Sequence, residues 1–139
     1  MKKILFSNSP ISGSLALLLL RVGAAALMMT HGWSKIVKFS EYLTKFPDPI
    51  GVGPAVSLQL TIFAEFFCAI LLALGFMTRL ALIPLMITMI VAVFIIHGDD
   101  PFGDKEIGLL YLATFTSLFL SGPGSISMDA QILKKNRYR

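Results

Sequence analysis

Residues 80–98 read LALIPLMITMIVAVFIIHG, without one Asp, Glu, Lys or Arg. Residues 107–128 also carry no charged side chain, and residues 49–78 carry one, Glu65. An apolar run of about 18 residues is long enough to cross a bilayer. Only 14% of the 139 residues are charged, against about 25% in soluble domains. The sequence therefore predicts a membrane protein and excludes a soluble enzyme, a transcription factor and a secreted disulfide-bonded scaffold.

The apolar stretches predict four membrane-spanning helices in one domain that covers residues 1–139. The expected spans are residues 13–35, 55–76, 78–96 and 105–120, followed by a basic tail at residues 125–139. Helices are favoured over a closed barrel because these stretches lack the alternation of polar and apolar residues that a barrel strand shows. We expect Gly75 to end the second helix and Thr78 and Asp104 to cap the third and fourth. The fold class is an all-α, integral membrane four-helix bundle.

A more polar segment separates the first two spans. Phe39, Tyr42, Leu43 and Phe46 recur there at helical spacing, with lysines and a glutamate between them. This pattern predicts a short helix that lies in the membrane interface.

The placement of Lys and Arg predicts the orientation, because short cytoplasmic loops carry the excess of these residues. One side of the membrane collects Lys2, Lys3, Arg79, Lys134, Lys135, Arg137 and Arg139, and the other collects Lys35, Lys38, Lys45 and Lys105. Both termini are therefore expected in the cytoplasm. The basic tail is expected to hold anionic lipid. Topology accounts for these basic residues, so nucleic acid is not an expected partner.

Two charged residues lie where a membrane helix accepts charge only at a cost of about 2.5–3.5 kcal/mol. They are Arg21 in the first span and Glu65 in the second. Counted from the cytoplasmic ends of their helices, their depths differ by about 5 Å. This predicts an Arg21–Glu65 pair, which could be either a structural clamp or a site for a ligand or proton.

A second polar group is expected near the outer surface. His31 and Lys35 are one helical turn apart and lie on the same side of the first helix as Arg21. His97 ends the third span, and Glu106 begins the fourth. A cleft that holds His31, Lys35, His97 and Glu106 would suit proton transfer beside a membrane-soluble ligand. The alternatives are histidines that only form hydrogen bonds at helix ends, a zinc or iron site at His31, His97 and Glu106, and a haem between the two histidines. The metal and haem readings are the less favoured ones, since no H-x-x-x-H or C-x-x-C spacing is present.

The order and spacing of these residues resemble the DoxX family of small bacterial inner-membrane proteins. The residues that carry the resemblance are Leu20-Arg21, His31-Gly32-x-x-Lys35, Glu65, Gly75-x-x-Thr78-Arg79, His97, Glu106 and Gly122-Pro123-Gly124-x-x-Ser127-x-Asp129. The resemblance implies a four-helix membrane bundle and, for some relatives, a place in membrane oxidoreductase complexes linked to thiosulfate and quinone. Relatives commonly have more glycine after the glutamate of the second helix. Here Phe66-Phe67-Cys68 follows, which argues against close helix packing at that point.

Two hypotheses for the function follow. The first is an inner-membrane subunit that supports redox chemistry by binding quinone or docking an oxidoreductase partner, with Arg21, His31, Lys35, Glu65, His97 and Glu106 as the candidate polar site. Because the chain has no nucleotide-binding loop or cysteine pair, the redox chemistry itself would come from a cofactor or a partner chain. The second is a non-enzymatic small transporter or membrane assembly protein, which would need a homo-oligomer to enclose a pathway.

Overall fold

Helices form where the apolar stretches lie. The computed structural model describes residues 12–137. Its elements are α2 (Gly13–Val37), α3 (Phe39–Tyr42), α4 (Pro54–Ile62), the π-helical turn η1 (Phe63–Cys68), α5 (Ala69–Leu74), α6 (Thr78–Val91), the π-helical turn η2 (Ala92–Ile96), α7 (Phe102–Ser121) and α8 (Met128–Arg137). Residues 12–137 contain no β-strand, so the expectation of an all-helical chain is confirmed for them.

Within residues 12–137, three continuous helical segments are long and apolar enough to cross a membrane. They are α2, the segment Pro54–Leu74 that joins α4, η1 and α5, and the segment Thr78–Ile96 that joins α6 and η2. The chain is therefore a membrane protein with several apolar helices. Helix α7 is a further long helix of 20 residues.

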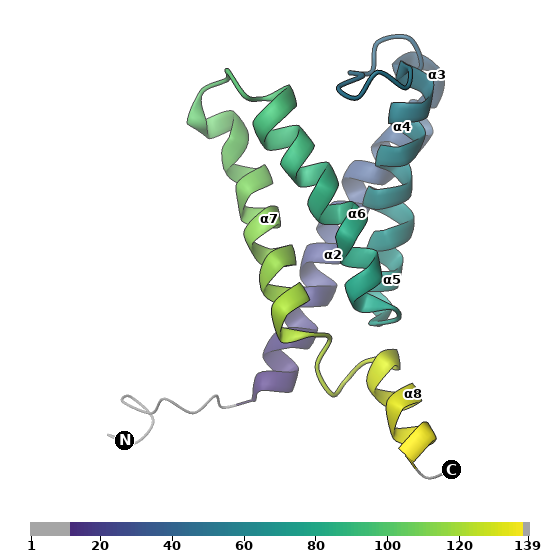
Figure 1. Cartoon of the computed structure of the whole chain (residues 1–139), viewed down its shortest axis with the longest axis vertical. Coiled ribbons are helices and arrows are strands. Elements are labelled where there is room, and N and C mark those ends of the chain that lie inside the picture. Colours follow the sequence, from purple (N-terminus) through teal and green to yellow (C-terminus); the bar gives the residue numbers. More distant parts are fainter. Residues whose placement is uncertain (1–11, 138–139) are drawn as a thin grey trace.

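The long helices pack as two pairs. Helix α2 lies along η1 and α5, and α6 lies along α7. The pairs meet where α6 contacts η1 and α5, and where α2 contacts α7. Toward α8 the pairs lie close together, and toward α3 they diverge (Figure 1). The centre of the bundle is filled by Ala25, Leu72, Leu82, Phe115 and Leu118, all fully buried.

Two of the three expected helix ends differ from the sequence expectation. Gly75 ends α5 in the left-handed conformation, with φ of 66°, as expected. Thr78 does not cap α6: the cap position is Met77, and the Asp129 carboxylate accepts hydrogen bonds from the N–H groups of Met77 and Thr78. Asp104 does not cap α7 either, because the helix already begins at Phe102 after Pro101, and Asp104 lies in its first turn.

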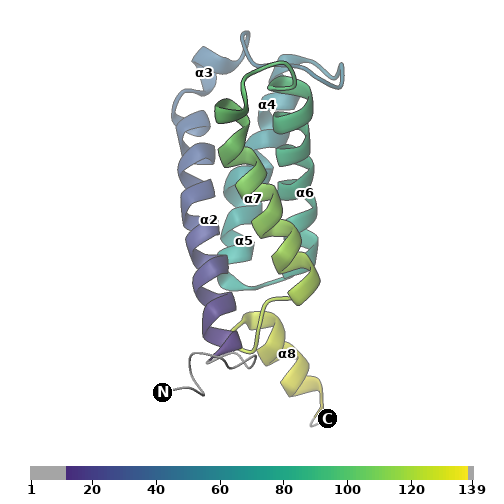
Figure 2. The ribbon, with the colours of Figure 1, turned by 90° about the vertical axis from the view of Figure 1, so that its left-hand side faces the viewer.

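The segment that joins α2 to α4 lies across one end of the bundle (Figure 2). Its helix α3 covers only Phe39–Tyr42, followed by turns through Leu43 and Phe46. A short helix is therefore present in this segment, about half as long as the periodicity of its aromatic residues indicated.

Candidate functional site

A cavity lies between the two helix pairs, toward the end where they diverge. Its volume is about 810 Å³. Most of its lining is apolar, from Met28 on α2, Leu60 on α4, Val93 on η2 and Ile107 on α7. Its polar lining comprises His31, Lys35, Tyr42, Ser57, Thr61, Glu65, Thr88, His97, Asp104, Lys105 and Tyr111. An apolar chamber with a few converging polar groups is the usual form of a small-molecule site.

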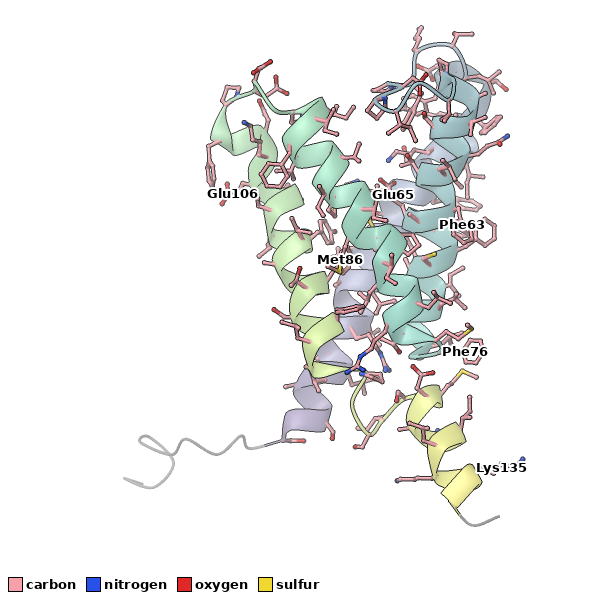
Figure 3. The ribbon with its side chains drawn as sticks, viewed as in Figure 1. Phe63, Glu65, Phe76, Met86, Glu106 and Lys135 are labelled. Atoms are coloured by element: carbon pink, nitrogen blue, oxygen red, sulfur yellow. The ribbon has the colours of Figure 1, made fainter. Side chains whose placement is uncertain are left out.

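An ion pair between Lys35 and Glu65 lies in this cavity. The Lys35 Nζ atom donates a hydrogen bond of 2.6 Å to Glu65 Oε2. The side chain of Glu65 is 7% exposed and that of Lys35 is 21% exposed. In Figure 3 the labelled Glu65 lies between α6 and the α4–α5 segment. The pair cancels both charges within the apolar part of the bundle, and the cavity leaves it accessible to a ligand.

Close packing of α2 on η1 brings the pair together. A Cβ atom on Gly32 would lie 2.8 Å from the backbone nitrogen of Phe66 and 2.9 Å from the backbone carbon of Glu65. The close approach that the sequence argued against at Phe66-Phe67-Cys68 therefore exists, and the facing helix supplies the glycine. Glu65 itself lies in a π-helical turn, a distortion that is often found at functional sites.

The two histidines lie at different places on the cavity wall. The His31 ring meets the Tyr111 ring edge to face, with ring centroids 6.1 Å apart, so this contact joins α2 to α7. His97 ends η2 at the rim, where its Nδ1 lies 2.7 Å from Asp100 Oδ2. Glu106 is exposed on α7 and does not line the cavity.

The loop after α3 covers part of the cavity and is held by Asp48. Its carboxylate accepts hydrogen bonds from the N–H groups of Val52 and Gly53 and from the Ser57 hydroxyl. The Ser57 hydrogen bond is the main reason that the pKa of Asp48 lies below its ordinary value. Phe46 and Ile50 of this loop face the cavity.

Arg21 belongs to a separate centre at the opposite end of the bundle. Its side chain is 2% exposed, and its two terminal nitrogens each donate a hydrogen bond of 3.0 Å, to the carbonyl oxygens of Pro123 and Ile126. A Cβ atom on Gly75 would collide with this guanidinium. Within residues 12–137, the Arg21 Nε atom has no hydrogen-bond partner.

The predicted Arg21–Glu65 pair is therefore wrong. The depth argument assumed that the two helices end level with each other. Instead Arg21 is level with Gly75 at the end of α5, whereas Glu65 is level with Gly32, eleven residues further along α2. The first two turns of α2 extend past the hairpin and pack on residues 122–127, as the contact of Gly124 with Leu17 shows.

Of the six candidate residues, the cavity brings together His31, Lys35, Glu65 and His97, and leaves out Arg21 and Glu106. The sequence argument missed Tyr111, whose hydroxyl-bearing ring in an apolar helix was the available signal. It also missed Asp48, whose signal was its position shortly before a helix that begins at Pro54. Over residues 12–137, no three His, Cys, Asp or Glu side chains gather as a metal site would require.

These features define the class of the protein: a helical membrane protein with a largely apolar cavity, into which a few polar side chains converge, near one end of its bundle. The chain belongs to the DoxX family, whose model matches residues 16–98. It is similar to an uncharacterized protein of Haemophilus influenzae, with 30% identity over 132 residues that cover 89% of this chain and 87% of the relative. No solved structure matches the chain.

Proposed function

We propose that the protein is an integral inner-membrane subunit that binds a quinone in its cavity and thereby supports the redox chemistry of a partner oxidoreductase. The observation that carries the proposal is the Lys35–Glu65 pair in a largely apolar cavity of about 810 Å³. A quinone has an apolar body and ring oxygens that accept hydrogen bonds. The cavity matches it, with a mostly apolar lining and a few polar side chains. The electron transfer itself belongs to a cofactor or partner chain.

The ion pair suits both redox forms of such a ligand. Lys35 can donate a hydrogen bond to a quinone carbonyl oxygen, and Glu65 can accept a hydrogen bond from a quinol hydroxyl. His31, one turn from Lys35 and against Tyr111, brings ring nitrogens that can donate or accept a hydrogen bond to the same wall. His97, hydrogen-bonded to Asp100, brings a second imidazole to the rim.

The proposal includes a membrane topology. Helix α7, with 20 residues packed along α6, would be a fourth span and would complete a four-helix bundle. Helix α3 would lie in the membrane interface, and both termini would be cytoplasmic. The lysines Lys35, Lys38, Lys45 and Lys105 lie toward the α3 end, and Arg79, Lys134, Lys135 and Arg137 lie toward the α8 end, which supports this orientation. Lys2, Lys3 and Arg139, also counted for it, lie outside the described residues.

The alternative is a small transporter or assembly protein, alone or as a homo-oligomer. A transport path would have to continue from the cavity to the other end of the bundle. Fully buried side chains fill that region, among them Ala25, Leu72, Leu82 and Phe115. This packing favours a binding chamber over a permeation path.

Glu65→Gln tests the proposal, with Glu106→Gln as the matched control. The same chemical change removes a carboxylate from the cavity in one variant and from an exposed position in the other. Each protein is purified in mild detergent, its folded fraction is measured, and quinone in the solvent extract is quantified by mass spectrometry. We expect wild type and Glu106→Gln to retain stoichiometric quinone, and Glu65→Gln to retain about tenfold less, as for the loss of one charged hydrogen bond. Equal retention in both variants, or none in the wild type, would contradict the proposal.

A further inference from the structure

Helix α8 is attached to the bundle through its first turn. The Asp129 carboxylate accepts three hydrogen bonds, from the N–H groups of Met77 and Thr78 and from the Thr78 hydroxyl. The Asp129 N–H donates to the carbonyl oxygen of Gly75. Thr78 begins the span Thr78–Ile96, so these contacts hold the start of α8 at the level where a membrane segment ends.

The face of α8 that carries Asp129 continues as an apolar surface beyond the bundle. Ile132 and Leu133 follow Asp129 by three and four residues and therefore share its face. They are 44% and 70% exposed, and in Figure 1 the helix extends away from the turn between α5 and α6. Figure 3 shows Phe76 in that turn near the start of α8, and Lys135 further along the helix. The face of α8 that touches the end of a span thus continues beyond that end with exposed apolar side chains.

Basic side chains flank this surface. Lys134 and Lys135 are exposed and follow directly after Leu133. The acidic residue of the helix, Asp129, is already engaged by the start of α6. The outer part of α8 therefore combines two exposed apolar side chains with positive charge, shortly beyond the end of the segment Thr78–Ile96.

We propose that α8 docks in the surface of an anionic phospholipid leaflet, with Ile132 and Leu133 in the acyl boundary and Lys134 and Lys135 at the headgroups. Two apolar side chains give only weak attachment by themselves, and each lysine near an anionic surface strengthens it by about fivefold. Docking also holds in place the preceding segment, whose Pro123 and Ile126 carbonyls bind Arg21. The proposal does not depend on the ligand of the cavity.

Tryptophan fluorescence of the full-length protein in vesicles tests this docking. The chain has one tryptophan, Trp33, so a Trp33→Phe background gives each further tryptophan its own signal. Leu133→Trp reports the proposed lipid-facing side, and Gln131→Trp, two residues from Asp129 and so on the opposite side of the helix, is the matched control. Both positions are exposed, so neither change disturbs the packed core.

We expect brominated phospholipid to quench Leu133→Trp much more than Gln131→Trp in vesicles that contain phosphatidylglycerol. Replacing both lysines by Gln should lower the ratio of docked to undocked helix by about fivefold for each lysine, and vesicles of phosphatidylcholine alone should give the same loss. Equal quenching at the two positions, or quenching that is the same in both kinds of vesicle, would overturn the proposal. A shielded Leu133→Trp that brominated lipid does not quench would overturn it as well, because a protein surface would then cover the helix.

Discussion

Two charged centres on helix α2 show two ways to place charge in an apolar bundle. At one end Arg21 is 2% exposed, and its terminal nitrogens bind two backbone carbonyls. About 21 Å further along the helix, Lys35 binds Glu65 beside a cavity and is 21% exposed. The first centre is packed on all sides, and the second adjoins space for another molecule. The contrast indicates that Arg21 serves stability and that the Lys35–Glu65 pair is available for binding.

The packed centre should show the largest effect on stability. In Arg21→Met the carbonyls of Pro123 and Ile126 lose their partners. We expect a loss of about 3 kcal/mol in the free energy of unfolding, from two charge-assisted hydrogen bonds of about 1.5 kcal/mol each. Unfolding in mixed micelles, followed by circular dichroism, measures it.

Arg21→Lys is the control for charge. An ammonium group is a compact point charge and does not reproduce the fork of the guanidinium, so we expect an intermediate loss. If Arg21→Met unfolds at the same point as wild type, then the carbonyls do not depend on Arg21 and the distinction between the two centres fails.

The Lys35–Glu65 pair can be disturbed by substituting Gly32, because this glycine lets α2 approach η1 closely enough for the pair to form. In Gly32→Ala the new methyl group meets the backbone of Glu65 and Phe66. We expect a loss of about 1–3 kcal/mol, as for other overpacked contacts, together with a loss of bound quinone because Lys35 moves away from Glu65. Gly23→Ala is the matched control on the same helix, since its Cβ atom would meet nothing within 4 Å.

For Gly23→Ala we expect a gain of up to about 1 kcal/mol, because alanine favours helix more than glycine does. The measurements are unfolding in micelles and extraction of quinone, on both variants in parallel. Equal behaviour of the two variants would show that the contact of α2 with η1 is loose and does not position the ion pair.

Much of the fold could be predicted because membrane insertion selects long uncharged runs. The observed segments Gly13–Val37 and Thr78–Ile96 nearly coincide with the expected 13–35 and 78–96. The site was harder to predict, since it depends on how far each helix extends past its neighbours. A shift of two turns in α2 moved Arg21 away from Glu65 and brought Lys35 to it. The spacing of residues within one helix does not show how far that helix extends past its neighbour, so this shift could not be predicted.

Contacts between segments that lie far apart in the sequence could not be predicted from local sequence patterns either. Asp129 caps α6 from 51 residues away along the chain, whereas local capping rules look within one turn of the helix start. Gly32 makes room for η1 from the facing helix. In both cases residue type was a sound signal of a special role, and only the packed structure identified the partner.

The smallest of these effects concerns pH at the Arg21 end. Burial by itself would raise the pKa of Asp129. The hydrogen bonds from Thr78 and Met77, with the charge of Arg21, outweigh burial and hold that pKa below its ordinary value. A carboxylate with a lowered folded-state pKa stabilises the protein above its unfolded pKa of about 3.9, and this contribution is lost as pH falls through the folded value.

Wild type should therefore lose stability as pH is lowered below about 4. Asp129→Asn should be less stable near neutral pH by about 1 kcal/mol, the usual worth of a charged helix cap. Its deficit relative to wild type should shrink in acid, because both proteins then carry a neutral side chain at residue 129. Asp99→Asn, at an exposed position at the other end of the bundle, is the control for general charge effects, and unfolding in micelles between pH 3 and pH 7 is the measurement. If the stability deficit of Asp129→Asn stays constant across this range, then residue 129 contributes by its shape alone. The charge of Asp129 would then not stabilise the end of the bundle that holds Arg21.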